Sequence, residues 1–132
     1  MSDLYVTGTS MPDVQSAIEA KLQADPSIDA VVTLGAPYAD TAVKAREGAG
    51  SKAEIDTFDL NAKVAAGLAD DSLGFAVDQQ PYLQGYQAVD LLWLYKYNGD
   101  VLGGGKPVLT GPQIITEDQA DELAEYTERG TR

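Results

Sequence analysis

Short apolar runs that alternate with helical patterns constrain this chain more than any other feature. Each run is rich in β-branched or aromatic residues and is apolar almost without interruption, as strands covered on both faces are. Five runs are expected to be strands: 4–8, 30–35, 55–58, 73–77 and 107–115. Because strand and helix alternate along the chain, we expect a three-layer α/β fold with a mostly parallel, doubly wound sheet of the flavodoxin-like type and right-handed crossovers.

Capping residues mark where the intervening helices begin and end. Ser10 with Asp13 resembles a capping box for the first helix, and Thr116 with Gln119 resembles one for the last. Gly130 is placed to cap the last helix at its C-terminus. The expected helices run from Ser10 to a stop at Asp25-Pro26, and then over about 38–49, 61–68, 81–97 and 117–129.

Length and composition favour one globular domain. The chain has 132 residues, of which 44% are apolar and 23% charged, and this is enough to close one hydrophobic core. We therefore expect residues 1–132 to form a single α/β domain. No apolar run approaches the roughly 18 residues of a membrane span. The opening stretch "MSDLYVTG" has no basic segment followed by an apolar core, so we expect no secretory signal in this chain.

Charge and residue usage exclude several classes of function. The formal net charge is −12, which repels phosphate and anionic lipid, so nucleic acid and membrane surfaces are poor partners. The chain has no cysteine and no histidine, so it lacks a thiolate nucleophile and the commonest general base and metal ligand. The stretch "GGGKP" lacks the spacing of a phosphate-binding loop. We expect no cofactor, no metal, no catalytic residue and no enzymatic activity.

The residues that follow the apolar runs stand where open α/β sheets bind ligands. Gly35 and Ala36 follow the second run, Asp59 the third and Gln79 the fourth, and we expect these strands to end on a common edge. Asp59 accepts hydrogen bonds while Gln79 donates and accepts, as a neutral polyhydroxylated ligand requires. Two alternatives stay open. Asp59 could be only the N-cap of the third helix, and Gln79 only the last residue before a turn.

The fourth helix is apolar on nearly all sides. Tyr82, Tyr86, Val89, Trp93 and Tyr97 share one face, and leucines spread around much of the rest. A helix of this kind must be buried on nearly all sides, and one sheet covers only one of them. We therefore expect self-association, as a homodimer through residues 82–97. The alternative is that the last helix folds back over it, although the apolar stripe of that helix is thin.

Several stretches together resemble a known family. They are "DPSIDAVVTLGAPYADTAVKAREGAG", "IDTFDLN", "VAAGLADDSLGFAVDQQPYLQGYQAVDLLWLYKYNG" and "PVLTGPQIIT". In this order they resemble the C-terminal part of the type I periplasmic sugar-binding proteins, the solute receptors of ABC importers, which share their fold with the effector domains of LacI-type repressors. The resemblance covers nearly the whole chain and less than half of the family's length, so the chain looks like a fragment or truncated product.

The resemblance implies one lobe of a periplasmic binding protein-like fold, in which two lobes close on a sugar. Asp59 then looks like the acid that accepts sugar hydroxyls, and Gln79 like the cleft glutamine. Relatives often place Asn-Asp where this chain has Gly35-Ala36, so the identity of the sugar stays open. Binding by this chain alone is expected to be weak or absent, because only one wall of the cleft is encoded.

The function implied is sugar recognition as the solute-binding component of an ABC-type importer. The permease of that importer would be the partner of the full-length protein, which is expected to be periplasmic or extracellular and membrane-anchored. The alternative is the effector-sensing lobe of a LacI-type transcriptional regulator. An enzyme built on a flavodoxin-like sheet is a distant third reading.

Overall fold

The computed structural model describes residues 4–8 and 10–132, in which four strands and five α-helices alternate. The strands are β1 (Ala30–Thr33), β2 (Glu54–Phe58), β3 (Ala76–Asp78) and β4 (Gln113–Ile115). The helices are α1 (Met11–Ala24), α2 (Ala36–Ala49), α3 (Ala62–Ala69), α4 (Pro81–Asn98) and α5 (Glu117–Glu128), with a short 3-10 turn η1 (Leu102–Gly105) after α4. The expected helices are confirmed, with ends that shift by a residue or two.

The four strands form one sheet in the order β1-β2-β3-β4. The first three run parallel, with Ala30 opposite Glu54 and Phe58 opposite Val77, and β4 joins the far edge antiparallel to β3. The mostly parallel α/β architecture is therefore confirmed. Because β1, β2 and β3 point the same way, their carboxyl ends lie on one edge of the sheet.

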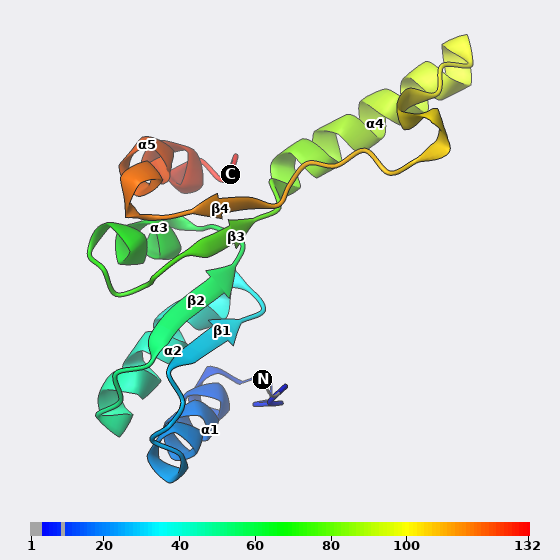
Figure 1. Ribbon diagram of the computed structural model, residues 1–132. Helices are drawn as coiled ribbons and strands as arrows, with labels where there is room; N and C mark the ends of the chain where they lie inside the picture. Colours follow the sequence, from blue (N-terminus) through cyan, green and yellow to red (C-terminus); the bar gives the residue numbers. More distant parts are fainter. Residues whose placement is uncertain (1–3, 9) are drawn as a thin grey trace.

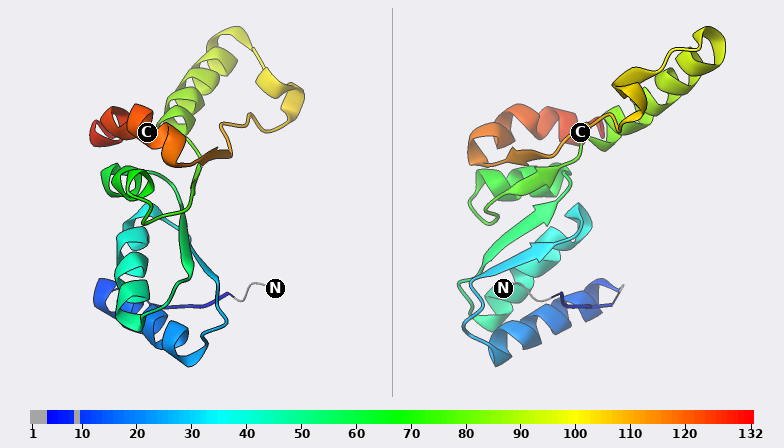
Figure 2. Two further views of the ribbon diagram at one scale, coloured as in Figure 1. Left: turned by 60° about the vertical axis from the view of Figure 1, so that its left-hand side comes forward. Right: turned by 45° about the vertical axis from the view of Figure 1, so that its right-hand side comes forward.

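The helices of the described residues that pack on the sheet all lie on one side of it. Figure 1 shows α2 behind β1 and β2, and the left view of Figure 2 shows α1, α2, α3 and α5 in a row on the same side. The core lies between these helices and the sheet, where Ile55, Val64, Leu68 and Ile115 are fully buried. The described residues thus build two of the three expected layers and leave the second face of the sheet open.

Two expected strands are corrected by the structure. Residues 4–8 are not a strand, and Leu4 and Val6 are exposed. Their β-forming composition is only a weak preference, and a strand also needs a neighbour to pair with its backbone. In the run 107–115, only Gln113–Ile115 enters the sheet. The preceding residues travel back alongside α4 (Figure 1), and Pro112 has no backbone N–H to donate to a ladder.

Capping explains where the helices begin. Ser10 Oγ accepts a 3.3 Å hydrogen bond from the backbone N–H of Asp13 at the start of α1. Thr116 and Gln119 form the expected capping box at the start of α5. After α5, Gly130 adopts a left-handed conformation with φ of 68°, which closes the helix.

The helix α4 stands apart from the sheet and the other helices, projecting to the upper right in Figure 1. All of α4 belongs to the described part of the chain, and none of its residues is buried. The helix α5 packs on α3 and leaves α4 uncovered, so the fold-back alternative is wrong. Within the described residues, no helix has the length and hydropathy to cross a membrane.

Candidate functional site at the carboxyl edge of the sheet

Asp59 and Gln79 meet at the shared carboxyl edge of β2 and β3. Nε2 of Gln79 donates a 2.7 Å hydrogen bond to Oδ1 of Asp59, which confirms that the two strands end together as predicted. The Gln79 side chain is exposed and that of Asp59 is half-buried, so both remain reachable from solvent. The pair offers carboxylate and amide oxygens as acceptors and an amide N–H₂ as donor.

Gly35 and Ala36 lie at the same edge, at the end of β1. Gly35 is the N-cap of α2 and has no side chain to cap it, and both residues are buried. They therefore present backbone groups to this edge rather than a polar side chain. Among the hydrogen bonds of the described residues, none joins them to Asp59 or Gln79, so the edge has a side-chain pair and a separate backbone element.

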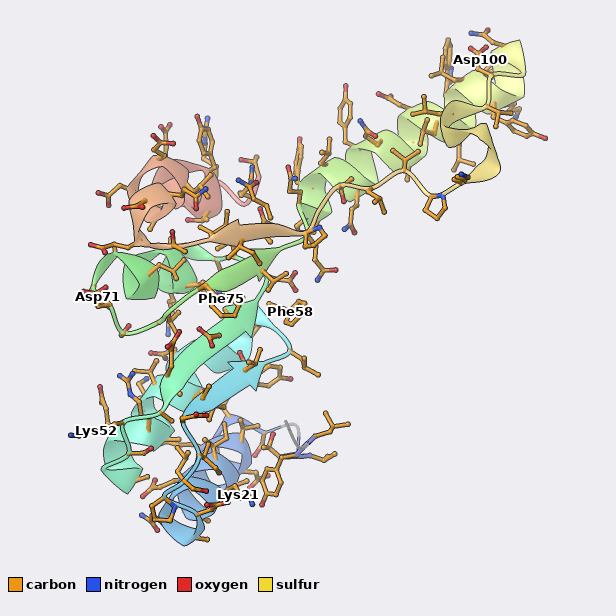
Figure 3. All side chains as sticks on the ribbon, viewed as in Figure 1. Lys21, Lys52, Phe58, Asp71, Phe75 and Asp100 are labelled. Carbon is orange, nitrogen blue, oxygen red and sulfur yellow. The ribbon has the colours of Figure 1, made fainter. Side chains whose placement is uncertain are left out.

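Asp59 has an unusual backbone conformation. Its φ is 66°, in the left-handed region, and its backbone N–H donates a 2.9 Å hydrogen bond to the carbonyl of Val77. The N-cap of α3 is Asn61, whose Oδ1 accepts from the N–H of Val64, so the reading of Asp59 as that cap is wrong. A non-glycine residue in this region costs on the order of 1–3 kcal/mol, and such residues gather at functional sites. The hydrogen bond to Val77 keeps the backbone of Asp59 at the carboxyl end of β2, directly after Phe58, which Figure 3 labels.

A second strained residue, Gln80, sets the direction in which α4 leaves the sheet. Its φ is 57°, and it is the N-cap of α4 without a side-chain capping bond. Its side chain Nε2 instead donates to the carbonyl of Thr110. Thr110 Oγ1 and Gln84 Nε2 each donate a 2.9 Å hydrogen bond to the carbonyl of Gln79. These bonds tie the segment leaving the sheet to the segment returning to it, and so hold the backbone of Gln79 in place.

A buried ion pair lies beneath this network. Asp78 is fully buried; its Oδ1 accepts from the N–H of Gln80 at 2.8 Å, and its Oδ2 accepts from Nε of Arg132 at 2.6 Å. Nη2 of Arg132 also donates to Oε1 of Gln113 at 2.5 Å. Sequence reasoning did not identify Arg132, because a lone arginine 54 positions from its partner belongs to no motif. A buried aspartate at the end of an apolar run was the available signal, since such a charge needs a partner.

A separate hollow of about 440 Å³ lies at the opposite, amino edge of the sheet. It is lined by residues such as Arg46, Glu54, Gly74 and Glu117, and neither Asp59 nor Gln79 borders it. Beside it, burial raises the pKa of Asp56, and the nearby Glu54 carboxylate adds to this. The hollow is far from the predicted edge, and we retain the carboxyl edge as the candidate site because it holds the strained, convergent polar groups.

The chemistry available at the carboxyl edge is hydrogen bonding to hydroxyl groups. In the part of the chain that the structure describes, no group of three or more acidic residues is arranged to hold a metal ion. Asp59 can accept hydrogen bonds from two hydroxyl groups, and Gln79 can donate and accept, which suits a polyol with adjacent hydroxyls. The carboxyl edge therefore offers hydrogen-bonding groups of the kind that an uncharged, hydroxyl-rich molecule can bond to.

Comparisons with known proteins place the chain in a family. A model of the periplasmic binding protein domain matches residues 3–99. The chain belongs to the periplasmic binding protein domain family. The curated xylose/arabinose-binding protein XylF of Sulfolobus acidocaldarius is 31% identical to it, with 86% of this chain and 30% of that protein covered.

Solved structures agree with this assignment. A carbohydrate transporter from Acidothermus cellulolyticus 11B, crystallised with myo-inositol, matches with a TM-score of 0.92 and 52% identity, covering 98% of this chain and 45% of that one. The binding protein of the arabinose ABC transporter from Shewanella sp. ANA-3 shares the fold at a TM-score of 0.73 and 24% identity, covering 92% of this chain and 41% of that one. The chain thus spans less than half the length of the periplasmic binding proteins it matches.

Proposed function

We propose that this chain recognises a sugar or related polyol as part of the solute-binding component of an ABC-type importer. Residues 1–132 would form its C-terminal lobe. The observation that carries the proposal is the hydrogen bond of 2.7 Å between Gln79 and Asp59 at the carboxyl edge. A bound polyol would replace this bond, with its hydroxyls donating to Asp59 and bonding to the Gln79 amide. The backbone of Gly35 and Ala36, which follows β1, would border the same ligand.

The relatives support this class of ligand. The Acidothermus protein, 52% identical, binds myo-inositol in its crystal, and the Sulfolobus relative is named for xylose and arabinose. All three of these ligands are uncharged and rich in hydroxyls. The Acidothermus protein is named as a carbohydrate transporter, and the Shewanella protein as the binding component of an arabinose ABC transporter. These names favour the importer over the LacI-type regulator and support binding without catalysis. A receptor of this kind would work outside the cytoplasmic membrane and deliver its ligand to a permease.

Two further parts of the proposal concern the chain by itself. One lobe provides one wall of a ligand cleft, and tight small-molecule sites bury most of the ligand surface. We therefore expect the isolated chain to bind sugars weakly or not at all. The exposed apolar helix also supports self-association through residues 82–97, because so large an apolar surface is seldom left in water.

A chimera tests the site. This chain would replace the matching part of the Acidothermus protein, to which 98% of it aligns, so that both walls of the cleft are present. Titration calorimetry with myo-inositol should then show micromolar binding. Asp59→Asn should weaken it about tenfold or more, since a hydrogen bond to a charged group contributes roughly 1.5–3 kcal/mol. Gln79→Ala should weaken it as well.

The matched control is Asp118→Asn, which changes an acidic residue bordering the hollow at the amino edge. It should leave the affinity of the chimera unchanged. Micromolar binding that survives Asp59→Asn and Gln79→Ala would remove these residues from the site. Micromolar binding by the isolated 132-residue chain, tested with pentoses, hexoses and inositols, would contradict the one-wall argument.

A further inference from the structure

The backbone carbonyl of Gln79 accepts two hydrogen bonds from side chains on different segments. Oγ1 of Thr110 donates at 2.9 Å from the segment 106–112, which leads from η1 back to β4. Nε2 of Gln84 donates at 2.9 Å from the start of α4, and the two segments meet where β3 ends (Figure 1). A carbonyl oxygen has two lone pairs, so both are used and the direction of this carbonyl is fixed from two sides.

The other end of the same peptide unit is held as well. The N–H of Gln80 donates a 2.8 Å hydrogen bond to Oδ1 of Asp78, whose side chain is fully buried. The peptide unit between Gln79 and Gln80 is therefore hydrogen-bonded at its carbonyl and at its N–H. A rotation of this unit would break all three hydrogen bonds at once.

The backbone conformation of Gln80 is the reason why this peptide unit needs to be held. Its φ of 57° and ψ of 58° are left-handed, although the next residue is Pro81 and a residue before proline ordinarily adopts an extended conformation. A flip of the peptide unit between Gln79 and Gln80 would bring φ of Gln80 into the negative range and relieve the strain. Strained residues persist where their surroundings over-determine them, and the three hydrogen bonds oppose the flip.

The segment 106–112 also lies against the Cα of Gln79. A Cβ added to Gly111 would be 3.4 Å from this Cα and 2.8 Å from the carbonyl oxygen of Asp78, so there is no room for a side chain between the two backbones. The Gln79 side chain extends from this Cα to Asp59, where its Nε2 donates at 2.7 Å. The neighbours Thr110 and Gly111 therefore constrain both the carbonyl and the Cα of Gln79.

We propose that Thr110 is a positioning residue for sugar recognition, whose hydroxyl fixes the backbone of Gln79 and so aims the Gln79 amide at a ligand bound to Asp59. The inference rests on the function proposed above and assigns a residue that acts through Gln79 rather than on the ligand. A glutamine side chain loses conformational entropy when a ligand orders it. With its backbone fixed beforehand, only the side chain has to be ordered, and this pre-organisation raises the affinity.

The test uses the chimera with the Acidothermus protein and myo-inositol as the probe. Thr110→Val keeps the shape of the side chain, removes its hydroxyl and should weaken binding about threefold to tenfold, the effect of one neutral hydrogen bond. Thr110→Ser retains the hydroxyl and should bind within about twofold of the unchanged chimera. The matched control is Thr127→Val in α5, where Oγ1 donates to the carbonyl of Ala124 at 2.8 Å. It should leave the affinity unchanged.

A double-mutant cycle separates positioning from other roles of Thr110. In the Gln79→Ala background, Thr110→Val should change the affinity by less than about twofold, because the amide that the hydroxyl positions is gone. Additive losses would overturn the proposal, since Thr110 would then act on the ligand or the fold without Gln79. An unchanged affinity of Thr110→Val alone would also overturn it. An unchanged affinity of Gln79→Ala is a different result, because it removes Gln79 from the site and the proposed function fails with it.

A measurement without ligand follows the same amide in the 132-residue chain. In ¹⁵N-labelled protein, the Gln79 N–H₂ resonances are identified by their loss in Gln79→Ala. They should lie away from the position of free glutamine amides, because Nε2 donates to Asp59. Thr110→Val, with an unchanged circular dichroism spectrum, should move them toward the free position, and Thr127→Val should not. Resonances that stay in place in Thr110→Val would show that the hydroxyl does not position the amide.

Discussion

Oδ2 of the fully buried Asp78 accepts a 2.6 Å hydrogen bond from Nε of Arg132. This bond joins the end of β3 to the segment that follows α5 in the sequence. Oδ1 of Asp78 also accepts from the N–H of Gln80, the N-cap of α4. One carboxylate thus anchors two segments that lie far apart in the sequence. Arg132 is the basic residue that pairs with this buried carboxylate.

Arg132→Ala should lower the free energy of unfolding by about 2–4 kcal/mol, because removing one partner of a buried pair leaves the other charge uncompensated. Urea denaturation measures this. The control is Arg129→Ala, whose pair with Glu125 at 3.7 Å is exposed and should contribute less than about 1 kcal/mol. Equal losses in the two variants would show that Asp78 does not depend on Arg132.

Asp56→Asn should be more stable than the natural chain at pH 7, and the difference in stability should shrink near pH 4. Burial raises the pKa of Asp56, so the folded state retains a proton that the unfolded chain releases. The carboxyl therefore contributes stability below its ordinary pKa, and the contribution is lost as pH rises through the folded value. The asparagine can still accept from the N–H of Phe75, which now bonds to Asp56 Oδ1 at 3.1 Å. Thermal unfolding at pH 4 and pH 7 measures the difference.

Asp40→Asn should show the opposite dependence on pH and serves as the comparison. Hydrogen bonds from Lys44 and Lys63 lower the pKa of Asp40. Its stabilising contribution is present above its ordinary pKa and is lost as pH falls through the folded value. The variant should therefore be slightly less stable than the natural chain at pH 7 and equal to it at low pH. If both variants changed stability in the same direction at pH 7, the raised pKa of Asp56 would be contradicted.

Asn61→Ala should lower the free energy of unfolding by about 1 kcal/mol, the usual cost of losing an N-cap. Oδ1 of Asn61 accepts a 2.8 Å hydrogen bond from the N–H of Val64 at the start of α3. Asn98→Ala, at the exposed end of α4, removes only a 3.3 Å contact with Asp100 and should change stability by less than about 0.5 kcal/mol. Chemical denaturation of both variants decides whether the cap operates as described.

Gly111→Ala should lower the free energy of unfolding by about 1–3 kcal/mol, the usual cost of overpacking, because it crowds the end of β3. A Cβ at this position would lie 2.8 Å from the backbone carbonyl oxygen of Asp78, which cannot move independently of β3. The contrasting variant is Gly85→Ala, where a Cβ would meet open space on α4. It should raise helix stability by roughly 0.5–1 kcal/mol. Circular dichroism during urea unfolding measures both effects. An equal change in stability for the two variants would contradict the close approach of Gly111 to the Asp78 carbonyl.

Two kinds of feature could be predicted from the sequence. These are the helix ends marked by capping residues, and the shared edge at which neighbouring parallel strands end. The capping pair Thr116 and Gln119 lies where it was expected. Asp59 and Gln79 were expected on one edge because parallel strands end together, and their hydrogen bond confirms it. The binding role of these residues, and that of Gly35 and Ala36, stays a prediction.

Features that depend on distant partners were missed. The run 4–8 has strand-forming residues, but pairing requires a neighbouring edge, which no local pattern reveals. The partner of Asp78 could not be read from the sequence, because Arg132 meets it only after α5 has packed on α3. The apolar character of α4 was recognised and predicted burial, yet every residue of this described helix lies outside the core.

Residues 81–112, which comprise α4, η1 and the segment that returns to the sheet, join the sheet through two adjacent segments, residues 78–80 and 110–113. A single covalent connection would let α4 swivel about its own axis and tilt in any direction. Here two connections are joined by the hydrogen bonds of Gln80 and Thr110. Rotation of α4 about its own axis would therefore have to displace both segments. Because residues 81–112 are held at two points, any rearrangement of α4 relative to Asp59 and Gln79 has to move both connecting segments together.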